Sequence, residues 1–175
     1  FKNFNCFVII IYLISSNFAY SIDRPNIKNL IIHKDKKKIE NNKEFFNSKS
    51  QKVSLNYYDS NIIIINFWAS WCAPCREEMP SLDKLKLNKE LRNIKILPIN
   101  IGDETYEKSK VFFEDLNIKN LEIFYGSGVK LANKFNIRGL PTTILIDKNW
   151  YEFARIIGYI DFENKDLLDW LINHL

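Results

Sequence analysis

Two cysteines separated by two residues, Cys72 and Cys75, lie where a run of β-branched residues meets an amphipathic helix. Residues 62–67 read IIIINF, and a continuous apolar run of this kind is typical of a central strand buried on both faces. After Cys75, Met79 and Leu82 recur at helical spacing with charged residues between them. We therefore expect a buried strand, a short turn and then a helix whose first turn carries both cysteines.

The start of a helix changes the chemistry of a cysteine. Unpaired backbone N–H groups and the positive end of the helix dipole stabilise a thiolate, so the pKa of the Cys72 thiol should fall below its free value of about 8.5. We expect Cys72 to be the exposed, attacking thiol. Cys75 should lie one helical turn further in, where it can close onto Cys72 and release a mixed disulfide. Ala73 and Pro74 are compact, and proline suits the first turn of a helix because that position needs no N–H partner.

A metal site is the main alternative for a close cysteine pair, but it needs further ligands. The third cysteine, Cys6, lies in an apolar segment at the amino end, and the two histidines are His33 and His174, far along the chain on either side. We therefore expect no metal and no cofactor, and a copper-carrying role lacks a placed histidine in the same way. The net charge of +4 is spread along the chain without an Arg-rich stripe, which argues against a nucleic-acid partner.

The amino end differs in composition from the rest of the chain. Residues 1–21 contain a single lysine before the apolar run 7–14, which is too short for an ordinary membrane span and fits a secretory signal. A cleaved signal peptide and an uncleaved membrane anchor both remain open. Residues 22–43 are rich in Lys, Asn and Asp, which predicts a solvated polar tether. The folded domain should then occupy residues 44–175.

Strands and helices alternate over that domain, which predicts an α/β fold with a sheet covered on both faces. We expect Pro80 to kink the cysteine helix, Asp103 to cap a helix that runs to about residue 116, and Asp161 to cap the last helix. The other expected elements are a hairpin of residues 45–47 and 52–55, strands at 94–100, 121–125, 142–146 and 151–157, and a helix at 128–135.

Two segments resemble the TlpA/ResA/CcmG group of thioredoxin-like proteins. Residues 66–80, NFWASWCAPCREEMP, are similar to the group's active-site segment, and residues 135–147, FNIRGLPTTILID, are similar to its later loop and strand. The resemblance covers about residues 45–175. It implies a thioredoxin fold, with a central mixed sheet flanked by helices, an N-terminal β-hairpin and a central insertion between residues 102 and 125.

The resemblance also implies roles for particular side chains. Pro141 matches the group's cis proline, which would leave the backbone of Leu140 free to pair with a substrate strand beside Cys72. Trp68 and Trp71 would shield the cysteine pair and offer apolar surface, with plain core packing as the alternative for Trp68.

Glu78 lies three residues past the second cysteine, where the group is thought to use a glutamate for proton transfer. An amide, Asn66, stands where cytosolic thioredoxins carry a buried aspartate, and an amide cannot titrate. A partly buried carboxyl near two thiols could have a raised pKa and relay protons. The alternative for Glu78 is a solvated charge on the helix face, which is the expectation for Glu77.

As a function, the resemblance implies an exported protein thiol–disulfide oxidoreductase in a bacterial-type periplasm. Its substrates would be protein dithiols and disulfides, such as those of apocytochromes c before haem attachment, and a membrane thiol carrier would supply its electrons. Two alternatives share the same fold: a general periplasmic oxidase or isomerase, and a redox-inactive or copper-binding module.

Overall fold

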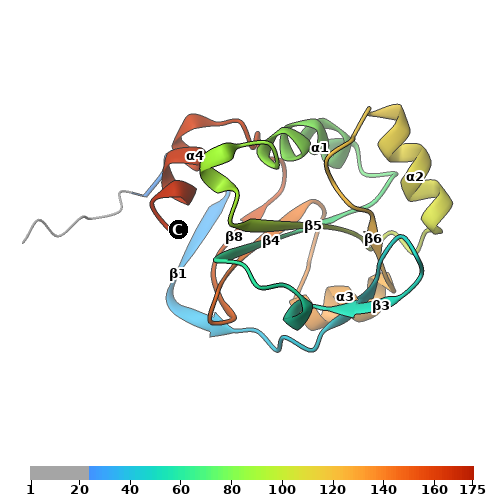
Figure 1. Cartoon of the computed structure of the whole chain (residues 1–175), viewed down its shortest axis with the longest axis horizontal. Coiled ribbons are helices and arrows are strands. Elements are labelled where there is room, and N and C mark those ends of the chain that lie inside the picture. The colour runs from blue at the N-terminus through green and yellow to red at the C-terminus, as the bar shows by residue number, and fades with distance from the viewer. Residues whose placement is uncertain (1–23) are drawn as a thin grey trace, which may run out of the picture.

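The computed structural model describes residues 24–175, whose centre is an eight-stranded mixed sheet (Figure 1). The strands lie in the order β1-β8-β7-β4-β5-β6-β2-β3. The central strands β4, β5 and β6 are parallel, and every other pairing in the sheet is antiparallel. The strands are β1 (Leu30–Lys38), β2 (Glu44–Phe46), β3 (Lys52–Ser54), β4 (Ile62–Trp68), β5 (Ile94–Asn100), β6 (Phe124–Tyr125), β7 (Thr142–Asp147) and β8 (Tyr151–Ile157). The helices are α1 (Ala73–Leu85), α2 (Tyr106–Asp115), α3 (Gly128–Phe135) and α4 (Lys165–Ile172), with short 3₁₀ turns at Leu55–Tyr57 and Lys89–Leu91.

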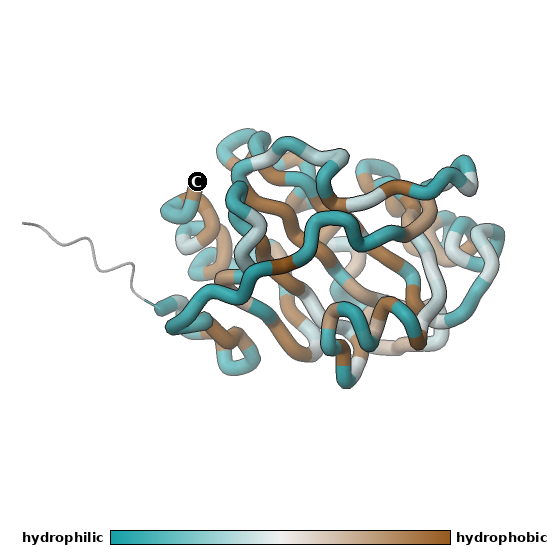
Figure 2. The backbone as a smooth tube through the Cα atoms, turned by 90° about the horizontal axis from the view of Figure 1, so that it is seen from below, coloured by the Kyte–Doolittle hydropathy of each residue, from teal (hydrophilic) through white to brown (hydrophobic). Residues whose placement is uncertain are grey.

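Helices cover both faces of this sheet, which confirms the predicted α/β architecture. The helices α1, α2 and α4 lie on one face, and α3 lies on the other (Figure 1). All of β4 is buried, and its side chains alternate: Ile64 and Trp68 pack in the layer of α1, whereas Ile65 and Phe67 pack in the layer of α3. Hydrophobic stretches accordingly run through the body of the molecule, and hydrophilic residues gather along its outer loops (Figure 2).

The predicted hairpin is present, because β2 and β3 pair in antiparallel fashion. The segment after β5 supplies the expected central insertion and contains α2. The helix α1 continues through Pro80.

The prediction of a solvated tether over residues 22–43 is wrong for residues 30–38. Residues 30–38 form β1, which pairs antiparallel with β8 at the edge of the sheet, and Leu30 is buried. The lysines that suggest a tether lie on this strand, and charged side chains are a common way to protect an edge strand from pairing with another chain. The compositional signal is thus that of an exposed sheet edge.

Two predicted helix caps are also wrong. Thr105 caps α2 with its side chain, and Asn164 caps α4. Asp103 has a positive φ of 55° and accepts the backbone N–H of Gly128 at 2.8 Å, so it ties two loops together. Asp161 accepts the N–H of Glu163 in the turn before α4. Neither aspartate therefore lies at an N-cap position, and each helix begins further along the chain, after a residue whose side chain accepts a backbone N–H of the first turn.

The segment 1–21, predicted to be a signal or an anchor, lies outside the described residues. Within residues 24–175, none of the helices combines the length and the hydropathy that crossing a bilayer requires.

Candidate active site

Cys72 and Cys75 lie at the start of α1, as the sequence predicts. Cys72 is the N-cap residue, Pro74 lies in the first turn, and the two sulfur atoms form a disulfide with an Sγ–Sγ distance of 2.08 Å. Cys72 is 5% exposed and Cys75 is fully buried. The expectation of an exposed Cys72 is therefore wrong in degree, because the disulfide turn lies close against the core. The predicted ranking of the two cysteines is right, because Cys72 keeps some exposure to solvent and Cys75 has none.

Sheet register places Pro141 opposite the cysteine turn. Phe67 pairs with Thr142 across the antiparallel β4–β7 ladder, so the next residues outward, Trp68 and Pro141, face each other at the end from which the cysteine turn departs. The Leu140–Pro141 peptide bond is cis. Pro141 is buried and Leu140 is half-buried. The two motifs that are far apart in sequence thus meet at one end of the sheet.

The two tryptophans of the active-site segment have different environments. Trp68 is fully buried, and its ring packs on Phe112 and Phe113 of α2, with centroid separations of 4.4 and 5.6 Å. Trp71, directly before Cys72, is 68% exposed. Trp68 is therefore a core residue that packs the insertion helix α2 against β4, as the alternative of plain core packing predicts. Trp71 is the tryptophan that offers apolar surface.

Glu78 is fully buried beneath the cysteine pair, so the alternative of a solvated helix-face charge is wrong. Its Oε1 accepts a hydrogen bond from Asn66 Nδ2 at 2.7 Å, and its Oε2 accepts the backbone N–H of Ile160 at 3.1 Å. Loss of water raises the pKa of Glu78 to about 8, against the opposing effect of both hydrogen bonds. Glu77 is exposed, as expected.

Asn66 organises the polar contacts under α1. Its Nδ2 also donates to Thr143 Oγ1 at 3.0 Å, whereas its Oδ1 is buried and has no hydrogen-bond partner within residues 24–175. Because Cys75 and Glu78 are three residues apart on one helix, they lie on the same face of α1, and the bond from Asn66 shows that this face lies over β4. A titratable carboxyl and the inner sulfur therefore share one buried layer.

A second carboxylate, Glu104, holds the loop that leads into the cysteine pair, a role that was not predicted from the sequence. Glu104 Oε2 accepts the backbone N–H of Ser70 at 2.8 Å and Asn100 Nδ2 at 3.0 Å, and Oε1 accepts the Ser70 hydroxyl. Partial burial raises the pKa of Glu104, but these hydrogen bonds outweigh it and the pKa lies below its ordinary value. The available signal was an acidic residue just past a buried strand, two residues after Gly102.

Replacing Glu104 with alanine is expected to lower the free energy of unfolding by about 1–3 kcal/mol, because partly buried donors of Ser70 and Asn100 lose their acceptor. Urea denaturation at neutral pH measures the change. The matched control is Glu107→Ala, an exposed glutamate in the first turn of α2, which should change stability by no more than about 0.5 kcal/mol. Equal stabilities of the two variants would show that the Ser70 contacts contribute nothing.

A groove of about 410 Å³ lies beside the cysteine turn, between α1 and α2. Ser70 and Arg76 line one side, and Val111 and Phe112 line the other. Val111 is 54% exposed, so the α2 side of this groove presents apolar surface. Among the described residues, no cluster of three or more His, Cys, Asp or Glu side chains is arranged to hold a metal ion.

Comparison with known proteins agrees with this geometry. The profile of the AhpC/TSA family matches residues 34–150, two thirds of the chain. The chain belongs to this family. The thiol–disulfide oxidoreductase ResA of Bacillus cereus is 30% identical over 129 residues, which cover 71% of this chain and 73% of that protein. The thiol:disulfide interchange protein HelX of Rhodobacter capsulatus is 33% identical over 100 residues, covering 57% of this chain and 54% of that protein.

Solved structures give the same fold. The crystal structure of a secreted thiol-disulfide isomerase from Corynebacterium glutamicum matches with a TM-score of 0.71 at 22% identity, covering 86% of this chain and 94% of that chain. The resemblance to the ResA/CcmG-like proteins of the thioredoxin superfamily is therefore confirmed. The AhpC/TSA-family chain described here is an enzyme of thiol–disulfide exchange.

Proposed function

We infer that this enzyme works as a reductant of protein disulfides, with Cys72 as the attacking sulfur and Cys75 as the resolving one. The observation that carries the proposal is the buried Glu78 carboxyl on the helix face of Cys75, because a reductant must deprotonate its inner thiol in a site that water does not reach. Trp71 and the groove beside it provide apolar surface for the polypeptide around the target disulfide.

The reaction balances in two exchanges. The Cys72 thiolate attacks one sulfur of the substrate disulfide, forming a mixed disulfide and releasing the first substrate sulfur as a thiolate, which takes a proton from water. Cys75 then gives its proton to the Glu78 carboxylate and attacks Cys72 Sγ, which releases the second substrate thiolate. The substrate gains two electrons, and Cys72 and Cys75 become a disulfide. A membrane dithiol carrier would reduce that disulfide and complete the cycle.

Two finer points belong to the same proposal. We place the enzyme outside the cytoplasm, with its leader either removed or kept as an anchor, because the leader has the pattern of a secretory signal. We assign apocytochromes c as its substrates, since the resemblance to the ResA/CcmG group points to cytochrome c maturation. A general oxidase or isomerase uses the same pair of cysteines and differs in the potential of that pair.

Trapping with the Cys75→Ser variant tests the proposal. Without a resolving thiol, the mixed disulfide on Cys72 should persist, so that partners can be purified under non-reducing conditions and identified. We expect apocytochromes among them, and we expect the wild-type pair to equilibrate with glutathione near the potential of thioredoxin. Capture of unrelated folding proteins together with a strongly oxidising potential would replace the reductant role with that of a general oxidase or isomerase. The matched control is the Cys72→Ser, Cys75→Ser double variant, which should trap nothing.

A further inference from the structure

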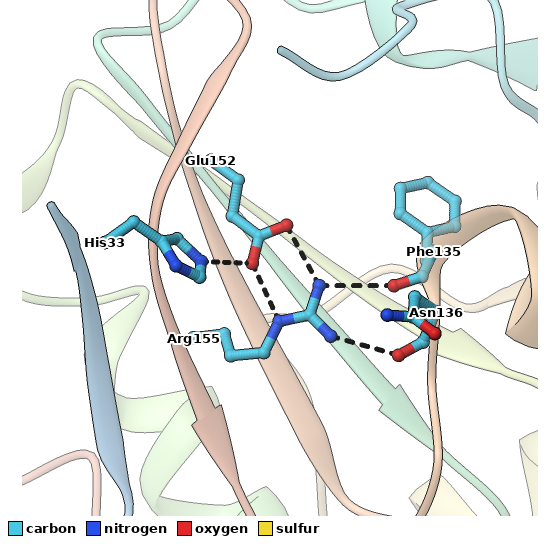
Figure 3. A network of polar contacts seen from close by, with 5 residues as sticks. All are labelled: His33, Phe135, Asn136, Glu152 and Arg155. Atoms are coloured by element: carbon cyan, nitrogen blue, oxygen red, sulfur yellow. Dashed lines mark hydrogen bonds and ion pairs between the residues drawn. The ribbon is translucent and has the colours of Figure 1, made fainter. Parts of the chain in front are cut away.

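A buried group of charges lies on the opposite side of the sheet from the cysteine helix. Arg155 of β8 forms a two-point ion pair with Glu152, with Nε–Oε1 at 2.7 Å and Nη2–Oε2 at 2.9 Å (Figure 3). His33 of β1 lies against the same carboxylate, with Nε2 2.7 Å from Oε1. The side chain of Glu152 is 1% exposed and that of Arg155 is 11% exposed. None of these three residues takes part in the chemistry proposed above.

The guanidinium of Arg155 points at the end of α3. Its Nη1 donates to the carbonyl oxygen of Asn136 at 3.1 Å, and its Nη2 donates to the carbonyl oxygen of Phe135 at 3.2 Å (Figure 3). Phe135 is the last residue of α3, and Asn136 follows it with a left-handed φ of 53°. The carbonyl groups at a helix end lack partners within the helix, so a cation there satisfies them and the helix dipole together.

These two carbonyls begin the segment 136–141, which ends at Pro141. The far end of this segment is fixed by other contacts: Thr142 Oγ1 donates to the carbonyl of Gly139 at 2.8 Å, and the Gly158 N–H donates to the carbonyl of Pro141 at 2.8 Å. Arg155 lies in β8 and Gly158 directly follows its last residue, so β8 and the residue after it hold the segment at both of its ends. Between them lies Leu140, whose backbone the resemblance to the TlpA/ResA/CcmG group implies as the contact for a substrate strand.

The buried charges are better explained by a need to hold the Arg155 guanidinium in one position than by a gain in stability. Taking an ion pair out of water costs about as much free energy as the pair returns, so apolar residues of similar volume would stabilise this layer equally well. Burial raises the pKa of Glu152, but the hydrogen bonds from Arg155 and His33 outweigh that effect and the pKa lies below its ordinary value. The carboxylate therefore stays charged and keeps the guanidinium in one orientation.

We propose that Arg155 is a positioning residue for the substrate: it fixes the start of the segment 136–141, so that the backbone of Leu140 stands beside Cys72 in the orientation that receives a substrate strand. Glu152 holds the guanidinium in place, and His33 links this arrangement to the edge strand β1. The inference rests on the proposed function and on the contact between the Leu140 backbone and a substrate strand that the resemblance to the TlpA/ResA/CcmG group implies.

The experiment measures how the full chain reacts with a large partner, a peptide with an internal disulfide, and with a small one, dithiothreitol. Arg155→Met keeps an unbranched, largely apolar side chain and removes all four hydrogen bonds of the guanidinium, two to Glu152 and two to the carbonyl groups of Phe135 and Asn136. We expect its KM for a peptide with an internal disulfide to rise roughly tenfold, because a small displacement of a binding segment weakens capture of the substrate. The rate at which dithiothreitol reduces the Cys72–Cys75 disulfide should stay within about twofold of wild type, since so small a reagent needs no docking strand.

Arg155→Lys should give an intermediate KM, because lysine keeps the charge and loses the two-point geometry. Lys36→Met is the matched control, since it removes an exposed ion pair between the edge strand β1 and Asp147 without touching the segment 136–141. It should leave unchanged both the KM for the peptide and the rate with dithiothreitol. An unchanged KM in Arg155→Met, or an equal loss with both reagents, would overturn the inference.

A second variant covers the case in which Arg155→Met does not fold. Glu152→Gln keeps the volume of the side chain and weakens the hold on the guanidinium, so it should raise KM and speed hydrogen exchange at the amides of residues 137–140. Slow exchange and an unchanged KM would again refute the positioning role. Failure of the proposed function looks different, because the wild-type protein itself would then neither reduce the peptide nor form a mixed disulfide through Cys75→Ser.

Discussion

Alanine at Cys72 is expected to abolish reduction of a protein disulfide, with a loss of at least about a thousandfold. Cys72 is the N-cap of α1 and retains 5% exposure, whereas Cys75 is fully buried, so the inner sulfur cannot replace the outer one as nucleophile. Reduction of insulin or of a disulfide-containing peptide, followed with excess dithiothreitol as the electron source, measures the loss.

Cys75→Ser provides the comparison at the second position. This variant should form the first mixed disulfide at a rate close to that of wild type and then stall, so that one equivalent of substrate thiol is released without turnover. If the Cys72→Ala protein still turns over substrate, Cys72 is not the attacking thiol and the roles assigned to the two cysteines are wrong. A Cys75→Ser protein that turns over normally would remove the need for an intramolecular disulfide.

Local sequence patterns predicted the parts of this fold that depend on near neighbours. The run IIIINF is long enough and β-branched enough to specify a buried strand, and its junction with a helix fixed both cysteines at the first turn. The burial of Glu78 could also be expected from its position three residues after Cys75, although its partner Ile160 lies 82 residues away and gives no local signal.

The sequence was misleading where composition and tertiary pairing point in different directions. Residues 30–38 have the composition of a solvated linker, yet β8 offers them an unpaired edge, and hydrogen bonds along that edge outweigh weak local propensity. The same pairing brings His33 to Glu152, which is separated from it by 119 residues. Nothing in the sequence near His33 reports that contact, so the whole charged group around Arg155 emerges only from the folded chain.

The buried environment of Glu78 predicts that its contribution to the free energy of unfolding falls as the pH rises. The pKa of Glu78 is raised to about 8 in the folded protein, above its value of 4.5 in the unfolded chain. Between these two values the folded state binds the additional proton, so the contribution of Glu78 to stability is greatest below about pH 4.5 and is lost as the pH rises through about 8. The steepest loss that one such group can cause is about 1.4 kcal/mol per pH unit.

Glu78→Gln should remove this loss and also change the rate profile. Glutamine cannot ionise, its oxygen can keep the N–H of Ile160, and its amide can donate to Asn66 Oδ1, which lacks a partner within residues 24–175. Urea denaturation of the oxidised protein at pH 5, 6.5 and 8 should therefore show stability falling with pH in wild type by about 1 kcal/mol or more relative to the variant. The release of substrate thiol by Cys75 should slow by about ten- to a hundredfold at neutral pH, because its general base is gone.

Glu77→Gln is the matched control, since it makes the same change of charge one residue earlier on the exposed side of α1. Its stability should follow the wild-type dependence on pH, and its rate should stay within about twofold of wild type. Parallel stability curves for wild type and Glu78→Gln would show that the buried carboxyl titrates as a free one does. A variant with altered stability and normal thiol release would leave Glu78 as a purely structural group, and the proton from Cys75 would then have to leave through water.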